Sequence, residues 1–193
     1  MSGARASLPV FTIGHSTRSL EAFVELLRAG EVRMVVDVRS VPRSRTNPHY
    51  NLDSLPGALA EYQIGHTRIA ALGGLRKRSA TVPPEVNAYW TNQSFHNYAD
   101  HALSDEFRTG LAELTALSLA RRTAIMCAES VWWRCHRRII ADYLLSAGRD
   151  VFHLMDHDKV VRAKPTPGMT IVGDGIHYPA ADEGQGEMFQ AAG

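Results

Sequence analysis

The strongest constraint on the fold is the run Met34-Val35-Val36-Asp37-Val38. It is a near-continuous series of apolar and β-branched residues, which is typical of a strand buried on both faces of a parallel sheet. A sheet of that kind needs helices on both faces to cover it. The run therefore predicts an α/β protein.

Other short apolar runs, near residues 10–13, 123–127 and 151–155, predict further strands. Between these runs, apolar residues recur at the spacing of a helix face. One such segment follows Ser19, which is a good helix N-cap. We therefore expect a single α/β domain with three layers, in which a mainly parallel sheet is flanked by helices in a Rossmann-like arrangement.

The 193 residues divide into three predicted segments. Residues 1–9 are expected to form a flexible N-terminus, residues 10–160 the α/β domain, and residues 161–193 an extended C-terminal tail rich in Gly, Pro, Ala and acidic residues.

The composition excludes several classes of protein. A net charge of +1 gives no overall field of the kind that marks a strongly basic nucleic-acid binder. Two cysteines are too few for a disulfide framework, and no signal peptide or membrane span is apparent. We expect a cytoplasmic protein in a reducing compartment, with no membrane partner.

Chemically versatile residues are concentrated between Met126 and Arg138, where a predicted strand leads into a predicted helix. In open α/β sheets, ligands bind at such connections beyond the carboxyl ends of strands. Cys135 should lie just before the first helical turn, beside His136 and arginines, so its pKa is expected to be lowered. The alternative is that Cys135 only packs in the core, and Cys127 is more simply explained as a buried strand-end residue.

Two other predicted strands end in polar loops that should reach the same edge of the sheet. The first loop contains His15 and Ser16, and the second contains Arg39 and Arg45 between two prolines. Arginines on rigid loops suit bidentate contacts with phosphate, although the second loop could also be an ordinary solvated basic loop. Asp37 should be paired with Arg39 or Arg137, because an unpaired buried carboxylate is costly.

Several of these motifs together resemble the family called domain of unknown function 488. They are Ile13–Ser16, Asp37–Arg45, Leu72–Gly74, Phe95–Ala99, and Cys127–Glu129 followed by Cys135–Arg137. The resemblance covers about residues 10–158. It implies no activity, so the chemistry has to be argued from the residues.

The residues favour an enzyme that acts on a phosphate-bearing nucleotide or nucleic acid, as a hydrolase or transferase. The expected catalytic residues are His15, Asp37, Glu129 and Cys135. The expected phosphate-binding residues are Ser16, Arg39, Arg45 and Arg137, and Trp133 is expected to pack on the substrate. No cofactor and no metal are assigned.

Two alternatives stay open. His15, Cys127, Glu129, Cys135 and His136 could supply ligands to a metal in a thiol or redox protein, although the cysteines lack the spacing of structural zinc motifs. A non-catalytic module could instead stack bases on Trp132 and Trp133. A phosphocysteine mechanism is disfavoured, because the position six residues after each cysteine is Trp133 or Ala141 rather than arginine.

Near the C-terminus, Gln185 is followed by Met188 and Phe189. The pattern is similar to short peptides by which bacterial repair and replication proteins dock on the sliding clamp. It predicts a clamp partner and, with it, an association with DNA repair.

Overall fold

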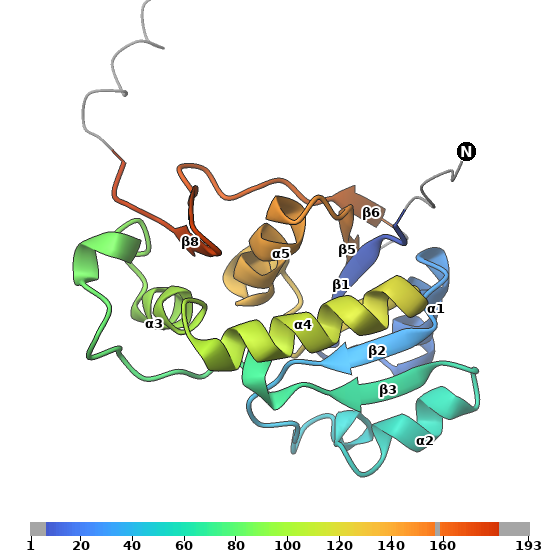
Figure 1. Ribbon diagram of the computed structural model, residues 1–193. Helices are drawn as coiled ribbons and strands as arrows, with labels where there is room; N and C mark the ends of the chain where they lie inside the picture. The colour runs from blue at the N-terminus through green and yellow to red at the C-terminus, as the bar shows by residue number, and fades with distance from the viewer. Residues whose placement is uncertain (1–6, 157–158, 182–193) are drawn as a thin grey trace, which may run out of the picture.

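In the computed structural model, residues 7–156 and 159–181 are described. The main sheet contains six strands (Figure 1): β1 (Val10–Gly14), β2 (Met34–Asp37), β3 (Gly65–Arg68), β4 (Thr123–Cys127), β5 (Val151–Met155) and β6 (Lys159–Arg162). Their order is β3-β2-β4-β1-β5-β6. Neighbours among the first five strands are parallel, and β6 is antiparallel to β5. The predicted α/β fold with a mainly parallel, Rossmann-like sheet is confirmed.

Within the described residues, five α-helices and four short 3-10 turns connect the strands. The α-helices are α1 (Leu20–Ala29), α2 (Leu55–Ala60), α3 (Gln93–His101), α4 (Asp105–Ala120) and α5 (Arg137–Ser146). The 3-10 turns are η1 (Pro48–Tyr50), η2 (Ala70–Leu72), η3 (Pro84–Asn87) and η4 (Trp132–Arg134). Side-chain N-caps fix the start of several helices: Ser19 accepts from the Ala22 amide at α1, and Asn92 accepts from two amides at α3. In the described part of the chain, no helix is both long and apolar enough to cross a membrane.

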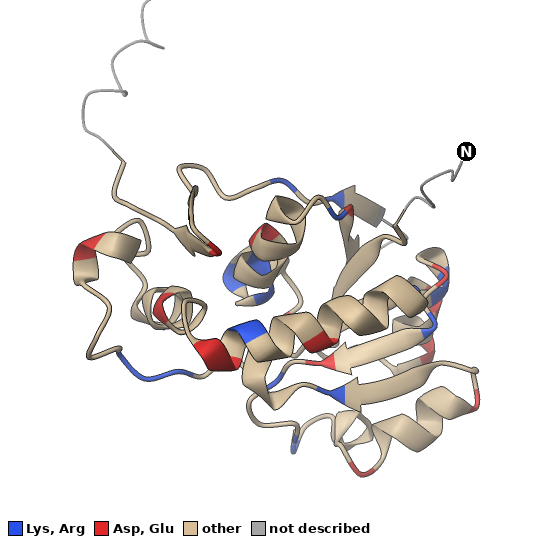
Figure 2. Ribbon diagram, in the orientation of Figure 1, with Lys and Arg blue, Asp and Glu red and all other residues tan. Residues whose placement is uncertain are grey.

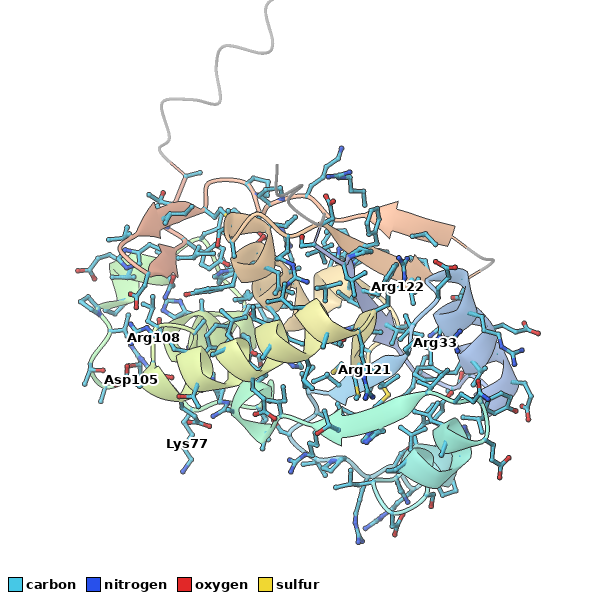
Figure 3. All side chains as sticks on the ribbon, turned by 45° about the vertical axis from the view of Figure 1, so that its right-hand side comes forward. Arg33, Lys77, Asp105, Arg108, Arg121 and Arg122 are labelled. Carbon is cyan, nitrogen blue, oxygen red and sulfur yellow. The ribbon has the colours of Figure 1, made fainter. Side chains whose placement is uncertain are left out.

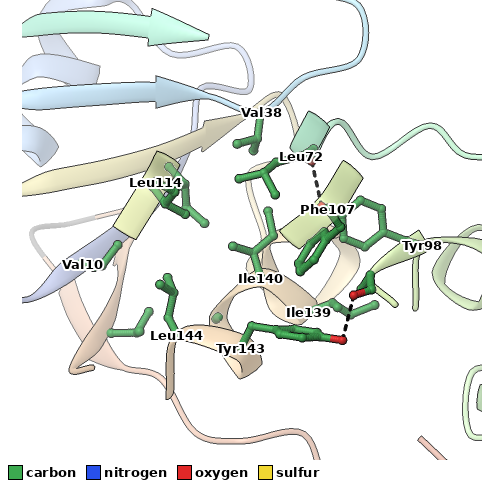
Figure 4. Close-up of a cluster of buried hydrophobic side chains, with 14 of the residues drawn as sticks. Val10, Val38, Leu72, Tyr98, Phe107, Leu114, Ile139, Ile140, Tyr143 and Leu144 are labelled. Carbon is green, nitrogen blue, oxygen red and sulfur yellow. Dashed lines mark hydrogen bonds between the residues drawn. The ribbon is translucent and has the colours of Figure 1, made fainter. Parts of the chain in front are cut away.

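The central strands β1, β2 and β4 are buried on both faces, as the apolar, β-branched runs predict. Val10 and Val36 point into a core shared with α3, α4 and α5, whereas their neighbours Phe11 and Val35 point into a second core shared with α1 and α2. Figure 4 shows the first core, where Tyr98 donates a hydrogen bond to the carbonyl of Leu72 at 2.8 Å. The sheet is therefore the middle of three layers.

The segment after residue 160 differs from its prediction. Instead of an extended tail, residues 159–162 form β6, and β7 (Thr170–Val172) pairs with β8 (Gly175–His177). Tyr178 is fully buried, and its hydroxyl donates to Asp142 at 2.9 Å. The predicted boundary near residue 160 is therefore wrong, because pairing with β5 and a few buried side chains, among them Ile176 and Tyr178, attach this segment to the domain.

Sheet order places a crevice at the carboxyl end of β4. The chain leaves β1 and β2, the two neighbours of β4, toward α1 and α2 on one face, but it leaves β4 toward α5 on the other face. Adjacent strands whose helices diverge in this way form a ligand-binding crevice. The loop after β4 is the segment singled out by the sequence.

Candidate functional site

Backbone hydrogen bonds continue past the ends of the central strands and hold three loops together. The amides of His15 and Ser16 donate to the carbonyls of Cys127 and Ala128, each at 2.9 Å, and the Val38 amide donates to the Met126 carbonyl at 3.0 Å. The predicted convergence of the loops after β1, β2 and β4 is confirmed.

The loop after β4 folds back on itself. Cys127 ends the strand, η4 follows, and Cys135 and His136 immediately precede α5. A hydrogen bond from the Arg137 guanidinium to the carbonyl of Glu129 closes the loop. The reversal brings the two cysteines to one place, although seven residues separate them in the sequence.

Cys127, Cys135 and His136 form a compact group, here called the cysteine–histidine cluster. The His136 Nδ1 atom lies 3.6 Å from the Cys135 sulfur and 3.9 Å from the Cys127 sulfur. All three atoms lie within 4.8 Å of one another. The Nε2 atom of His136 is 3.0 Å from the Val38 carbonyl, so Nε2 carries the proton and Nδ1 presents its lone pair to the sulfurs.

The pKa values of Cys135 and Cys127 are shifted in opposite directions. Burial alone would raise the pKa of Cys135, but the hydrogen bond from the Cys127 thiol and the Arg137 charge outweigh it and hold this pKa well below its ordinary value. The Arg137 Nε donates to the Cys135 sulfur at 3.2 Å. The pKa of Cys127 is raised because its thiol donates to Cys135 and because it is buried. Of the two cysteines, Cys135 therefore has the lower pKa, which is the direction expected from the sequence.

The cluster faces a pocket of about 180 Å³, here called the site pocket. Its lining residues are Gly74, Ser94, Phe95, Cys127, Glu129, Arg134, Cys135 and His136. Glu129 and Arg134 are exposed at its mouth, whereas Cys135 is 4% exposed. Two of the predicted catalytic residues, Glu129 and Cys135, thus share one pocket.

The other two predicted catalytic residues, His15 and Asp37, belong to a buried network. Arg39 grips both carboxylate oxygens of Asp37, with a closest distance of 2.6 Å, which confirms one of the two predicted partners of Asp37. The remaining Arg39 donors reach the Tyr50 carbonyl at 2.7 Å and His15 Nε2 at 3.2 Å. His15 also stacks on Tyr50, with ring centroids 4.2 Å apart. Neither His15 nor Asp37 lines the site pocket.

The predicted phosphate-binding residues lie in different environments. Arg45 is exposed, and Ser16 is partly buried with a positive φ of 47°. Arg39 and Arg137 are 4% and 1% exposed, and their guanidinium groups are engaged by the protein itself. Trp133, the predicted packing residue, is 47% exposed and contacts Trp132 edge-on.

The catalytic and phosphate-binding residues expected from the sequence do not include Cys127, His136 or Arg134. The sequence leaves both Cys127 and His136 open as metal ligands, although the cysteines lack the spacing of structural zinc motifs. The signal was present in the sequence, since both lie in the loop that contains Cys135. Only the reversal of that loop shows that His136 reaches both sulfurs, because adjacent side chains at a helix start usually point apart.

Buried histidines predict a loss of stability at mildly acidic pH. Burial lowers the pKa of His15 to about 4 and that of His153 to about 3, from an ordinary value of 6.5. Below that value the unfolded chain binds protons that the folded chain excludes, so stability falls as the pH drops from about 6.5 toward 4. Between pH 7 and 5 we expect a decrease of about 2 kcal/mol for each of these two histidines, measured by urea unfolding.

His153→Asn should remove about half of this pH dependence. The Nδ1 atom of His153 is 2.8 Å from the Thr12 hydroxyl, a hydrogen bond that an asparagine amide can approximate. Equal free energies of unfolding at pH 7 and pH 5 in the unmodified protein would contradict the expectation.

Comparison with known proteins identifies the family of this chain. The family described as Domain of unknown function DUF488 matches residues 19–144, which run from the cap of α1 into α5 and include the cysteine–histidine cluster. A search of curated proteins and a search of solved structures found no match. Because the family match spans well over half of the sequence, the chain belongs to the DUF488 family.

Proposed function

We propose that this protein is an enzyme that acts on a phosphate-bearing nucleotide or nucleic acid in the site pocket. One observation carries the proposal: the pocket joins an electron-rich sulfur centre, a carboxylate and a guanidinium at the carboxyl edge of the sheet. These groups supply bond chemistry, proton transfer and anion binding, the three roles that such a reaction needs.

Arg134 is the residue best placed to hold a phosphate. Its side chain is exposed at the mouth of the pocket, and it has no ion-pair partner within residues 7–156 and 159–181. A planar guanidinium can contact two phosphate oxygens at once. The phosphate-binding role expected from the sequence for Arg39 and Arg137, which are buried, is therefore proposed for Arg134.

Glu129 is suited to proton transfer. Its carboxylate is exposed in the same pocket, and its Oε1 accepts a hydrogen bond from the Val131 amide at 3.3 Å. That contact orients the carboxylate while leaving its other oxygen for a substrate or water.

Further exposed arginine and lysine side chains favour a substrate that carries several phosphates. Arg43 and Arg45 lie in the loop after β2, and Lys77 and Arg78 lie between η2 and α3. Figure 2 shows basic positions on these connecting segments. Phosphates spaced along a nucleic-acid strand would meet such loops, and the half-exposed Trp133 offers a ring on which a base can stack.

Binding and turnover together test the proposal. Arg134→Ala should weaken binding of a labelled oligonucleotide and reduce the slope of log K against log salt by about 1. Arg33→Ala is the matched control. Arg33 is exposed, its amide donates to the Arg122 carbonyl at 2.8 Å, and it lies toward the end of α4 far from Lys77 (Figure 3). Glu129→Gln should retain binding but slow product formation by about 100-fold or more, as followed by mass spectrometry. If no nucleotide or oligonucleotide binds or is converted, the proposal fails.

Docking on a sliding clamp is a further proposal, and it rests on sequence alone. Gln185, Met188 and Phe189 lie outside the described residues. A peptide of residues 181–193 is expected to bind the clamp with a Kd on the order of micromolar and to lose binding on Gln185→Ala or Phe189→Ala. No binding at about 100 μM peptide would rule the docking out. If it binds, DNA is favoured over a free nucleotide as the substrate.

A further inference from the structure

We infer that Cys127, Cys135 and His136 bind one divalent metal ion of the zinc class, with a fourth coordination position open to the site pocket. Metal binding by itself does not depend on the proposed function. Only the catalytic use of the metal rests on it.

The distances from the imidazole nitrogen to the two sulfurs are close to those around a tetrahedral metal. Zinc–sulfur bonds of about 2.3 Å and zinc–nitrogen bonds of about 2.0–2.1 Å place a sulfur and a nitrogen about 3.6 Å apart at the tetrahedral angle. The observed separations from His136 Nδ1 are 3.6 Å to Cys135 and 3.9 Å to Cys127. Small side-chain shifts would complete the coordination.

The ring of His136 is already oriented as a ligand. Its Nε2 proton is directed at the Val38 carbonyl, 3.0 Å away, which leaves the Nδ1 lone pair facing the two sulfurs. Metal-binding histidines nearly always donate their second ring N–H to a carbonyl or carboxylate in this manner. Packing also fixes the ring, since Tyr98 contacts it edge-on with centroids 4.8 Å apart.

A hydrogen bond also holds the Cys135 sulfur in place. Arg137 donates to the Cys135 sulfur at 3.2 Å, a contact that stabilises an anionic sulfur. A divalent ion would bind both cysteines as thiolates, and any proton still on either sulfur would be released to solvent. Two thiolates and a neutral imidazole then balance the ion's two positive charges.

Gly74 leaves space next to the lone pair. A Cβ atom at this position would lie 2.3 Å from His136 Nδ1. Any larger residue would therefore block the approach of a metal ion to this nitrogen. Gly74 lines the same pocket as Glu129.

Three protein ligands indicate a reactive rather than a structural site. Structural zinc sites are closed by four protein ligands, whereas catalytic sites keep one position for water or substrate. Within the described residues, the group of nearby cysteine, histidine and carboxylate atoms has three members. The open position would face the site pocket, where Glu129 could take a proton from metal-bound water.

Metal analysis of the full-length protein tests the inference. Protein purified without chelators is expected to contain about one zinc-class ion per chain by plasma mass spectrometry. After removal of the metal, titration with Co²⁺ should produce thiolate-to-metal absorption that saturates at about one equivalent. Cys127→Ser, Cys135→Ser and His136→Ala should each weaken Co²⁺ binding by more than about 100-fold, since even residues behind the ligands contribute about 10–100-fold.

Two controls separate ligand loss from unfolding. His177→Ala removes an imidazole from β8, away from the cluster, and should bind Co²⁺ normally. Gly74→Ala keeps all three ligands but should lose affinity, and circular dichroism should show native helix content in each variant.

Other outcomes would overturn the inference. One is a featureless Co²⁺ titration of protein in which both thiols are shown to be free. A second is a Cys127–Cys135 disulfide that forms in place of metal binding, and a third is unchanged affinity in His136→Ala. Metal binding without turnover of any nucleotide or nucleic acid would instead reject the proposed function, whereas turnover by metal-free protein would reject the catalytic role of the metal.

Discussion

Replacing Asp37 with alanine is expected to lower the free energy of unfolding by about 3–5 kcal/mol, the usual cost of removing one partner from a buried ion pair. Asp37 is fully buried, and its partner Arg39 is 4% exposed. Without the carboxylate, the Arg39 guanidinium keeps only the Tyr50 carbonyl and His15 as partners. Urea unfolding followed by circular dichroism measures the change.

Two comparisons isolate the pair. Asp53→Ala removes an exposed carboxylate and should change the free energy of unfolding by less than about 0.5 kcal/mol. The double variant Asp37→Leu with Arg39→Met should recover part of the loss, because it removes both charges and keeps side-chain volume in the core. An Asp37→Ala variant as stable as the unmodified protein but inactive would instead support the catalytic role predicted from the sequence.

The second large effect is expected from Gly14→Ala, at the end of β1. A Cβ atom there would lie 1.8 Å from the Glu129 carbonyl oxygen and 2.8 Å from the Ser130 Cα. Both are backbone atoms and cannot rotate away, so β1 and the loop after β4 must separate. We expect a loss of stability at or above the upper end of the about 1–3 kcal/mol that overpacking usually costs.

Movement of that loop should also expose the cysteine–histidine cluster. The native Gly14→Ala protein is expected to react faster with a thiol reagent than the unmodified protein, because Cys135 is shielded by the loop that is displaced. Gly57→Ala is the matched control: Gly57 lies in α2 with open space around its Cβ position, and alanine there should stabilise the helix by about 0.5–1 kcal/mol. If Gly14→Ala and Gly57→Ala have the same free energy of unfolding and thiol reactivity, the close approach of Gly14 to the Glu129 carbonyl has no energetic consequence.

Much of the fold follows from local sequence patterns. The run Met34–Val38 is apolar and β-branched because β2 is buried on both faces, and the four predicted strands appear at the expected places. Ser19 caps α1 because a serine oxygen can accept from a free amide of the first turn. The convergence of the loops also follows from sequence, since parallel strands that alternate with helices bring their carboxyl ends to one edge.

The side-chain partners within the site were decided by the tertiary structure. Arg39 and Arg137 read as phosphate-binding residues in the sequence, but the fold turns both inward, where Asp37 and Cys135 compensate the charge of the guanidinium groups. Likewise, β6 and the buried Tyr178 depend on contacts with residues distant in the sequence. The local pattern of a short polar segment does not predict such contacts.

The amino-acid sequence by itself thus determined the class of fold and the edge of the sheet at which chemistry is concentrated, because burial on both faces and helix capping are local properties of the chain. Only the tertiary structure decided that Cys127, Cys135 and His136 meet. Their contact depends on the reversal of the loop after β4 and on the Val38 carbonyl that orients the imidazole. Residue spacing does not encode such a contact, because the loop's path is set by partners distant in the sequence.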